Sequence, residues 1–164
     1  MLLAFFIRYF IFQPFVVDGH SMQPSFTNNE YILVNKLSYR FGKPHRGDVI
    51  VFESPTTAGV DYIKRIIGLP GENIKIKDNH IYINGEKLKE RYLTEDIKTE
   101  IKNTKGSGFD LTLAENEYFV MGDNREHSSD SRVFGALPED KIIGKAWFIV
   151  YPWNIFGFVK NSNY

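Results

Sequence analysis

Cysteine is absent from the chain, which excludes disulfide bonds and a thiol nucleophile. An excess of either charge is absent as well, because 20 basic and 20 acidic side chains give a formal net charge of +0. This balance argues against a nucleic-acid partner. Ligand-like spacing is missing among the histidines, so the sequence predicts neither a metal site nor a cofactor; they stand at His20, His45, His80 and His127.

Internal repeats and a second domain are also lacking. The length of 164 residues, 43% of them hydrophobic, suits one compact domain with its own core. A long apolar run occurs at the start of the chain, and no later segment has the pattern of a long helix.

The first segment, MLLAFFIRYFIFQPFVV (residues 1–17), is apolar except for Arg8, Gln13 and Pro14. As a helix it would be roughly 25 Å long at about 1.5 Å per residue, against roughly 30 Å for the bilayer core. Pro14 would end this helix near Gln13. We expect a membrane-anchor helix at 1–17, and the sequence leaves open whether an upstream portion belongs to it. The alternatives are a helix lying in the membrane interface and a core element of a soluble protein.

From residue 31 onward, β-branched and aromatic residues gather in short segments bounded by turn residues. This pattern is typical of strands. The sequence therefore predicts a mainly β fold with coiled, barrel-like antiparallel sheets over residues 18–160, and a polar surface excursion at 85–110. We predict strands at 31–36, 48–53, 62–67, 74–78, 80–84, 117–122 and 145–151.

Turn signals punctuate these strands. The segment IKIKDNHIYING (74–85) alternates isoleucines on both sides of an Asp-Asn pair, which predicts a hairpin. LPGE (69–72) has proline and glycine where a type II turn needs them, and PEDK (138–141) can start a single helical turn. The aromatic segment YPWNIFGFV (151–159) favours either contact with the membrane interface or a structural role in core packing or strand termination.

Ser21 lies in the Gly/Pro-marked turn GHSMQPSF (19–26). A serine becomes a nucleophile when a base lies within hydrogen-bonding distance. His20 cannot be this base, because neighbouring side chains of an extended segment point to opposite faces. Lys64 is the better candidate, since its segment YIKRIIGLPGE (62–72) begins as an apolar strand. The alternative is that Lys64 extends to water and Ser21 caps a turn.

Burial is what would make Lys64 a useful base. At an ordinary pKa near 10.4, about one lysine in 2,500 is uncharged at pH 7. Use of that lysine as a base would add roughly 4.6 kcal/mol to the reaction barrier. Burial can lower a lysine pKa by about 3 to 5 units, which would remove most of this addition.

A third polar segment, GDNREHSSDSR (122–132), combines charges of both signs with three serines and an amide. Such a loop can orient a catalytic lysine through a hydroxyl while Asp–Arg pairs fix its own shape. Taken alone, it is equally well explained as a self-capped polar turn.

In this order, GHSMQPSF, RGDVIVF, YIKRIIGLPGE and GDNREHSSDSR resemble the sequence boxes of bacterial type I signal peptidases. These Ser–Lys endopeptidases remove signal peptides from exported proteins. The resemblance runs from the apolar segment to about residue 150 and implies a β-rich catalytic core behind an N-terminal membrane helix. It also implies preprotein signal peptides and the lipid bilayer as partners, and a single-pass protein of the cell membrane whose catalytic domain faces the extracytoplasmic side.

The resemblance implies a role for each matching residue. Ser21 becomes the nucleophile and its backbone N–H an oxyanion donor, Lys64 the general base, and Ser128 the residue that orients the lysine. Gly19 stands where some family members carry a second oxyanion donor, a serine, so here that donor is missing or is replaced by water or backbone. Two pairs would hold the site without taking part in the chemistry: Asp123 with Arg65, and Asp130 with Arg132.

In the family, the substrate lies extended beside the strands that flank both catalytic residues. The matching segments here are Val16–Gly19 and Asp61–Ile63. Shallow apolar pockets along this path would explain cleavage after a small residue at −1, with a small residue also at −3. The resemblance places along the substrate path the residues Val17, Asp18, Met22, Tyr62 and Ile63.

Other classes of protein fit parts of the pattern. A membrane-tethered β-domain could bind peptides without cutting them, although both Ser21 and Lys64 are present. A self-cleaving Ser–Lys repressor-type peptidase shares the dyad, but begins with a DNA-binding or polar arm instead of an apolar run. A histidine-dependent serine hydrolase is a third alternative.

Overall fold

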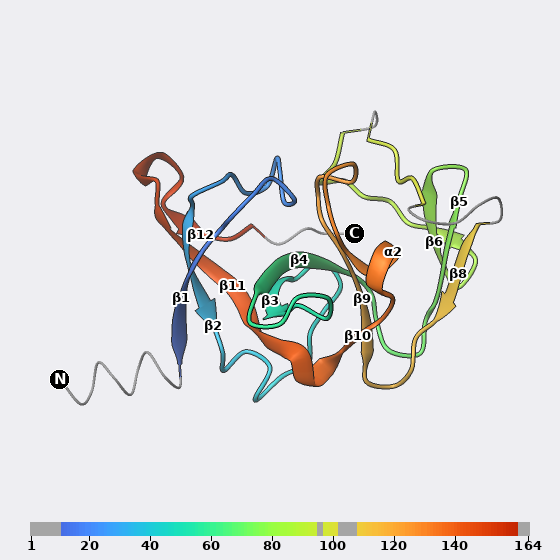
Figure 1. Ribbon diagram of the computed structural model, residues 1–164, viewed down its shortest axis with the longest axis horizontal. Helices are drawn as coiled ribbons and strands as arrows, with labels where there is room; N and C mark the ends of the chain where they lie inside the picture. The colour runs from blue at the N-terminus through green and yellow to red at the C-terminus, as the bar shows by residue number, and fades with distance from the viewer. Residues whose placement is uncertain (1–10, 95–96, 102–107, 161–164) are drawn as a thin grey trace.

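The computed structural model describes residues 11–94, 97–101 and 108–160. Within these residues the chain forms two antiparallel sheets, one of eight strands and one of four (Figure 1). The larger sheet has the order β1-β2-β11-β3-β4-β9-β10, and β12 pairs with β11. Its strands are β1 (Phe12–Val16), β2 (Tyr31–Asn35), β3 (Val49–Glu53), β4 (Asp61–Gly68), β9 (Glu117–Met121), β10 (Leu137–Pro138), β11 (Ile142–Tyr151) and β12 (Gly157–Phe158).

The smaller sheet has the order β7-β6-β5-β8 and lies to the right of the larger sheet in Figure 1. Its strands are β5 (Asn73–Lys77), β6 (His80–Ile83), β7 (Glu86–Lys87) and β8 (Phe109–Thr112). Helical segments are short: α2 (Ser131–Phe134), η1 (Glu139–Lys141) and η2 (Trp153–Ile155). The prediction of a mainly β, antiparallel fold is therefore confirmed.

The strands agree closely with the sequence periodicity. Six of the seven predicted segments match a strand to within one residue at each end. The exception is β11, which begins three residues earlier than predicted and passes through Gly144. Glycine is required there, because a Cβ would lie 2.6 Å from the backbone oxygen of Asn35 in β2. Strands of two residues, such as β7 and β12, are too short to show a periodicity.

The predicted turns are also confirmed. Asp78 and Asn79 both have positive φ, 49° and 62°, as a type I′ hairpin turn requires. Between Leu69 and Glu72 the N–H···O distance is 3.1 Å, and Gly71 has φ +79°, which makes this a type II turn. The PEDK segment contains the short helix η1.

Strand β4 links three hydrophobic clusters. Ile63 belongs to the cluster under β1, β2 and β11, Ile66 to the one between β3 and β9, and Ile67 to the one that joins β9 to the smaller sheet. Its residues from Ile63 to Gly68 are all buried, so both faces of this half of the strand are covered. A polar side chain on this part of β4 is therefore held in a fixed, largely dry environment.

The helix expected at 1–17 is wrong for its last residues, which form a strand. Phe12–Val16 form β1, which pairs with β2 from Phe12↔Asn35 to Val16↔Tyr31. Pro14 is tolerated in this strand because β1 lies at the edge of the sheet, where an N–H can be missing. Residues 1–10 of the expected helix lie outside the described residues. Across the ranges described, no helix is long and apolar enough to span a membrane.

The C-terminal aromatic segment is exposed. Trp153, Phe156 and Phe158 are 74%, 55% and 66% exposed. Trp153 and Phe156 contact each other, and Phe158 packs against Trp147 of β11. Of the two interpretations offered by the sequence, burial in the core is wrong for these rings.

Candidate active site

Ser21 lies in a tight turn between β1 and β2. Two backbone hydrogen bonds close this loop near its base: the Val17 N–H donates to the Glu30 oxygen, and the Asn29 N–H donates to the Val17 oxygen, both at 2.8 Å. Met22 and Phe26 are buried beneath it in the hydrophobic core. The half-buried Ser21 is thus carried by a loop that is fixed at its ends and from below.

Lys64 of β4 reaches the Ser21 hydroxyl. Its Nζ lies 2.8 Å from Ser21 Oγ and 2.8 Å from the backbone oxygen of Ile63, close enough for hydrogen bonds to both. The side chain is 4% exposed. The ring of Tyr62, with its centroid 5.2 Å from Nζ, covers another side of the amine. The structure therefore brings the two predicted catalytic side chains into direct contact.

Burial makes Lys64 a much weaker base than an ordinary lysine. Loss of water lowers the pKa of Lys64 to about 8, opposed by the charges of Asp130, Tyr62 and Asp123. At a pKa of about 8, roughly one molecule in ten carries an uncharged amine at pH 7. The lysine can accept a proton from the Ser21 hydroxyl without a large addition to the barrier.

The polar loop 122–132 packs against the backbone of Ser21. The Asn124 N–H donates to the Ser21 oxygen at 3.0 Å. Gly122 makes this approach feasible, since a Cβ there would lie 2.4 Å from that oxygen and 2.3 Å from Ser128 Oγ. Because the Ser21 carbonyl is held by this loop, the orientation of its peptide depends on the loop.

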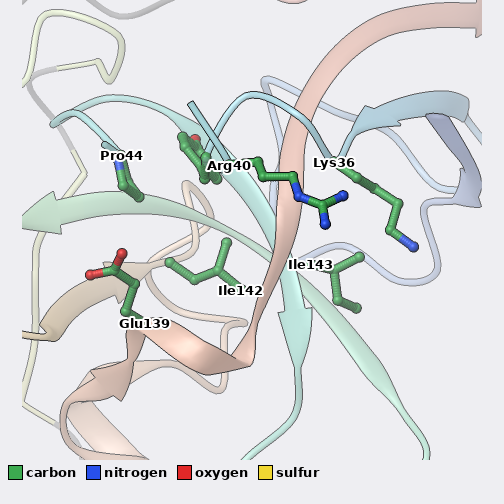
Figure 2. Close-up of a pocket in the computed structure, with 7 residues that line it drawn as sticks. Lys36, Arg40, Pro44, Glu139, Ile142 and Ile143 are labelled. Carbon is green, nitrogen blue, oxygen red and sulfur yellow. The ribbon is translucent and has the colours of Figure 1, made fainter. Parts of the chain in front are cut away.

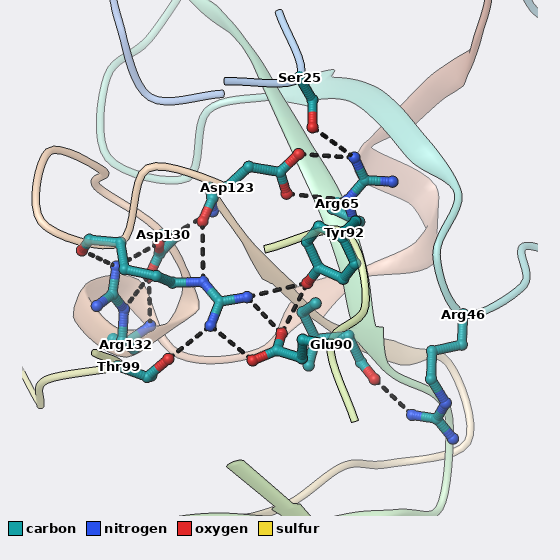
Figure 3. A network of polar contacts seen from close by, with 12 residues as sticks. Ser25, Arg46, Arg65, Glu90, Tyr92, Thr99, Asp123, Asp130 and Arg132 are labelled. Carbon is teal, nitrogen blue, oxygen red and sulfur yellow. Dashed lines mark hydrogen bonds and ion pairs between the residues drawn. The ribbon is translucent and has the colours of Figure 1, made fainter. Parts of the chain in front are cut away.

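Two buried ion pairs fix this region, and both were predicted. Arg65 binds both carboxylate oxygens of Asp123, at 2.9 and 2.6 Å, and also donates to the oxygen of Gly47 (Figure 3). Arg132 binds Asp130 in the same bidentate way at 2.8 Å for each contact. The partners are at most 2% exposed, so these are charge pairs enclosed in the protein.

Ser128 is buried beside Gly122. Burial raises the pKa of the Asp130 carboxyl, but Arg132 and, to a smaller extent, the Ser128 hydroxyl act against it and hold this pKa below its ordinary value. The hydroxyl therefore lies in the carboxylate–arginine cluster next to the Ser21–Lys64 pair.

The two residues predicted for the oxyanion site, Ser21 and Gly19, differ in the hydrogen bonding of their backbone N–H groups. No hydrogen bond among the described residues takes up the Ser21 N–H, which leaves it available to a substrate. The Gly19 N–H instead donates to Asn28 Oδ1 at 2.8 Å. Gly19 has φ +89°, a conformation that strains any residue with a side chain.

A pocket of about 480 Å³ lies beside Ser21 and Lys64. Of the predicted substrate-binding residues, Asp18, Tyr62 and Ile63 line it. Val17 and Met22 do not line it, because they are 2% and 1% exposed and pack into the core beneath the loop. The other lining residues are Phe15, Val16, Gly59, Val60, Asp61 and Ser129.

A second pocket, of about 450 Å³, is lined by Lys36 and Arg40 on one side and by Glu139, Ile142 and Ile143 on the other (Figure 2). None of the residues predicted for the site lines it. The chemistry predicted from the sequence therefore belongs to the pocket beside Ser21.

Arg125, for which the sequence predicted no role, is 1% exposed and binds both carboxylate oxygens of Glu90. Tyr92 and Thr99 complete its surroundings (Figure 3). These partners come from the segment predicted to be a polar surface excursion. The sequence held one signal for this role. Asp123 and Asp130 were assigned to other arginines, so the charged Arg125 of the same loop was left without a predicted partner.

Known proteins are similar to this chain in sequence and in fold. The family model described as "Signal peptidase, peptidase S26" matches residues 1–153. The chain therefore belongs to the signal peptidase family S26, and the resemblance drawn from the four sequence boxes is confirmed.

Relatives match over nearly the whole chain. Signal peptidase I S of Bacillus subtilis (strain 168) is 42% identical over 163 residues, covering 94% of this chain and 85% of that protein. Signal peptidase IB of Staphylococcus aureus (strain MRSA252) is 34% identical over 170 residues, covering 97% and 88%. The crystal structure of a signal peptidase I from Enterococcus faecalis V583 is similar with a TM-score of 0.52 and 36% identity, over 63% of this chain and 97% of that one.

Replacement of Lys64 by methionine should stabilise the protein in a pH-dependent way. In the folded protein the pKa of Lys64 is about 8, against 10.5 when unfolded, so the unfolded state binds more protons between these values and stability rises with pH. The lowered pKa of Lys64 reduces the free energy of unfolding by about 3 kcal/mol near pH 6.5 and by about half as much at pH 9.5. Lys64→Met removes this reduction. Urea unfolding of both proteins at the two pH values measures this difference; an equal difference at both would contradict the low pKa.

Asp123→Asn should destabilise the protein by about 3 to 5 kcal/mol, because it leaves the buried Arg65 without its counter-charge. Glu53→Gln is the matched control: it breaks the exposed pair with Lys141 and should change stability by less than about 1 kcal/mol. Urea unfolding of the two variants tests the contrast. Similar losses of stability in both variants would show that the buried Asp123–Arg65 pair contributes no more than an exposed pair.

Proposed function

We propose that this protein is a membrane-bound serine endopeptidase that removes N-terminal signal peptides from exported preproteins. The observation that carries the proposal is the 2.8 Å contact between Lys64 Nζ and Ser21 Oγ, with the lysine buried and its pKa lowered to about 8. Membership of the signal peptidase family supports the substrate class.

The reaction is acyl transfer through Ser21. Uncharged Lys64 takes the hydroxyl proton as Ser21 Oγ attacks the carbonyl carbon of the −1 residue. The protonated lysine then gives this proton to the departing amine, and the peptide bond breaks to leave an ester on Ser21. Lys64 next removes a proton from a water molecule as the water oxygen attacks the ester. The protonated Lys64 returns this proton to Ser21 Oγ as the ester bond breaks, which frees the serine and releases the signal peptide with a carboxyl group.

The Ser21 N–H stabilises the oxyanion of each tetrahedral intermediate. The Asn124 hydrogen bond to the Ser21 oxygen holds the peptide group that follows in the chain. The Gly19 N–H is engaged by Asn28, so a second donor comes from water or from another backbone group. Ser128 and the pairs Asp123–Arg65 and Asp130–Arg132 hold the lysine and the loop in position.

The substrate binds as an added strand. Asp61–Lys64 pair with β3 along one edge, whereas β9 pairs with β4 from Arg65 onward, so the other edge of Asp61–Lys64 has no strand partner among the described residues. This free edge borders the pocket beside Ser21. An extended peptide can donate and accept backbone hydrogen bonds there.

Specificity follows from the walls of this path. Tyr62 and Ile63, opposite Val16 and Asp18, limit the size of side chains beside Ser21. We assign to this pocket the preference for small residues at −1 and −3, since larger groups would meet side chains already packed in the sheet.

The membrane holds the enzyme where its substrates emerge. The apolar N-terminal segment attaches the enzyme to the cell membrane as a single-pass protein, and the catalytic domain lies on the extracytoplasmic face. The exposed rings of Trp153, Phe156 and Phe158 are suited to the membrane interface, which favours aromatic side chains. Attachment to the bilayer reduces the search for signal peptides from three dimensions to two.

Ser21→Ala and Lys64→Ala should each abolish cleavage of a preprotein, by at least about 10³-fold in kcat/KM, because one removes the nucleophile and the other its base. His127→Ala, which alters an exposed histidine of the neighbouring loop, should cut at the normal rate after the small −1 residue. Electrophoresis of the products with detergent-solubilised protein measures this. Normal cleavage by Lys64→Ala would refute the dyad, and a wild-type protein that binds preprotein without cutting it would indicate a peptide-binding domain.

The rate should rise with pH through an apparent pKa of about 8. Lys64 acts as a base when it is uncharged, and its protonated fraction falls as pH rises through the pKa of the buried amine. Below pH 7 we expect kcat/KM to fall about tenfold per pH unit. Initial rates between pH 5 and 9 test this; a flat profile over that range would be incompatible with Lys64 as the base.

A further inference from the structure

Residues 88–94 and 97–101, here called the strap, connect the smaller sheet to the polar loop 122–132. At the sheet, the Leu88 N–H donates to the Ile81 oxygen at 2.8 Å and the Thr99 N–H to the Asn79 oxygen at 3.2 Å. Half-buried strap residues Leu88, Tyr92 and Ile101 pack against the hydrophobic cluster between the sheets. The strap is therefore attached to the small sheet at its base.

At its other side the strap encloses the guanidinium of Arg125. Nη1 donates to Glu90 Oε2 at 2.9 Å and to Thr99 Oγ1, while Nη2 donates to Glu90 Oε1 and to the Tyr92 hydroxyl at 2.9 Å. Nε donates to the Gly122 oxygen at 3.1 Å. All five N–H groups of an arginine are thus used, four of them by the strap.

The Arg125 bond to Gly122 closes a turn of four residues. Within this turn the Asn124 N–H donates to the Ser21 oxygen. A continuous series of contacts therefore runs from Glu90 through Arg125 and the turn to the peptide of Ser21.

The other two arginines of the site also contact the strap. The Arg65 guanidinium lies 4.4 Å from the centre of the Tyr92 ring, and Arg132 Nη1 donates to the Glu100 oxygen at 3.0 Å. Each of these arginines also binds an aspartate next to the Ser21–Lys64 pair. The strap is thus placed to hold the whole loop against the catalytic residues.

We propose that Glu90 is a positioning residue: its ion pair with Arg125 holds the 122–125 turn against the Ser21 carbonyl and so keeps Ser21 in place beside Lys64. This inference rests on the proposed peptidase function. Glu90 itself touches neither Ser21 nor Lys64, so its effect reaches the reaction through Arg125.

The chemistry of the pair explains why a charge is needed. Arg125 is buried, and a neutral partner would leave its guanidinium without a counter-charge in a dry site. The turn would then relax toward water, withdraw Asn124 from the Ser21 oxygen, and admit water to Lys64. A displacement of about 1 Å of a catalytic group can reduce a rate by about 10²-fold.

The test compares two double variants. Glu90→Gln with Arg125→Met removes both charges of the pair, so no buried charge is left alone to unfold the protein. Glu72→Gln with Arg46→Met does the same to another bidentate pair, which does not contact the 122–132 loop. For each we would measure preprotein cleavage, its pH profile, and hydrogen exchange at the Asn124 amide.

We expect the Glu90/Arg125 variant to lose about 10- to 100-fold in kcat with KM changed less than about threefold. Its pH profile should move to higher pH, since water would reach Lys64, and Asn124 should exchange faster by at least about tenfold. The Glu72/Arg46 variant should match the wild type in all three measurements on the folded protein.

Wild-type kcat and an unmoved pH profile in the Glu90/Arg125 variant would overturn the proposal, even if that variant were less stable. If the wild-type protein itself cuts no preprotein, the proposed function fails instead. In that case the exchange rate of Asn124 still decides whether Glu90 holds the turn, and unchanged exchange would refute it.

Discussion

The site depends on the exclusion of water from one amine. Lys64 contacts Ser21 at 2.8 Å while β4 and its neighbours bury it to 4% exposure, and this burial lowers its pKa to about 8. A buried cation is unfavourable, so the fold must supply compensating packing. Strand β4 does this because it contributes to all three hydrophobic clusters. Ordinary core packing thus creates the environment in which a lysine can act as a base.

The same constraint explains why the surroundings of Lys64 contain so many ion pairs. A loop with several charges must lie against an apolar strand, and each buried charge then requires a partner. Asp123 with Arg65 and Asp130 with Arg132 satisfy this requirement inside the site. Such pairs add little net stability compared with hydrophobic residues, but they hold polar groups in one arrangement. Their main effect here is to keep the loop against Ser21.

The arrangement of the strands brings these pieces together at one place. β1 leads from the apolar N-terminal segment into the turn of Ser21, and the free edge of β4 lies beside it. The smaller sheet lies on the other side of the loop 122–132 and reaches it through the strap. A peptide in the pocket would therefore meet Ser21, Lys64 and an edge of β4 that has no strand partner in the described part of the chain.

The sequence alone determined seven of the twelve strands among the described residues, the hairpin turn, the type II turn and, through the family resemblance, the pairing of Ser21 with Lys64. These features depend on neighbouring residues or on short motifs. Only the tertiary structure decided that Val17 and Met22 face the core, and that Phe12–Val16 pair as an edge strand. The contact between Glu90 and Arg125 joins residues 35 positions apart. No local pattern encodes such a contact, because it forms when burial of the strap excludes water from both charges.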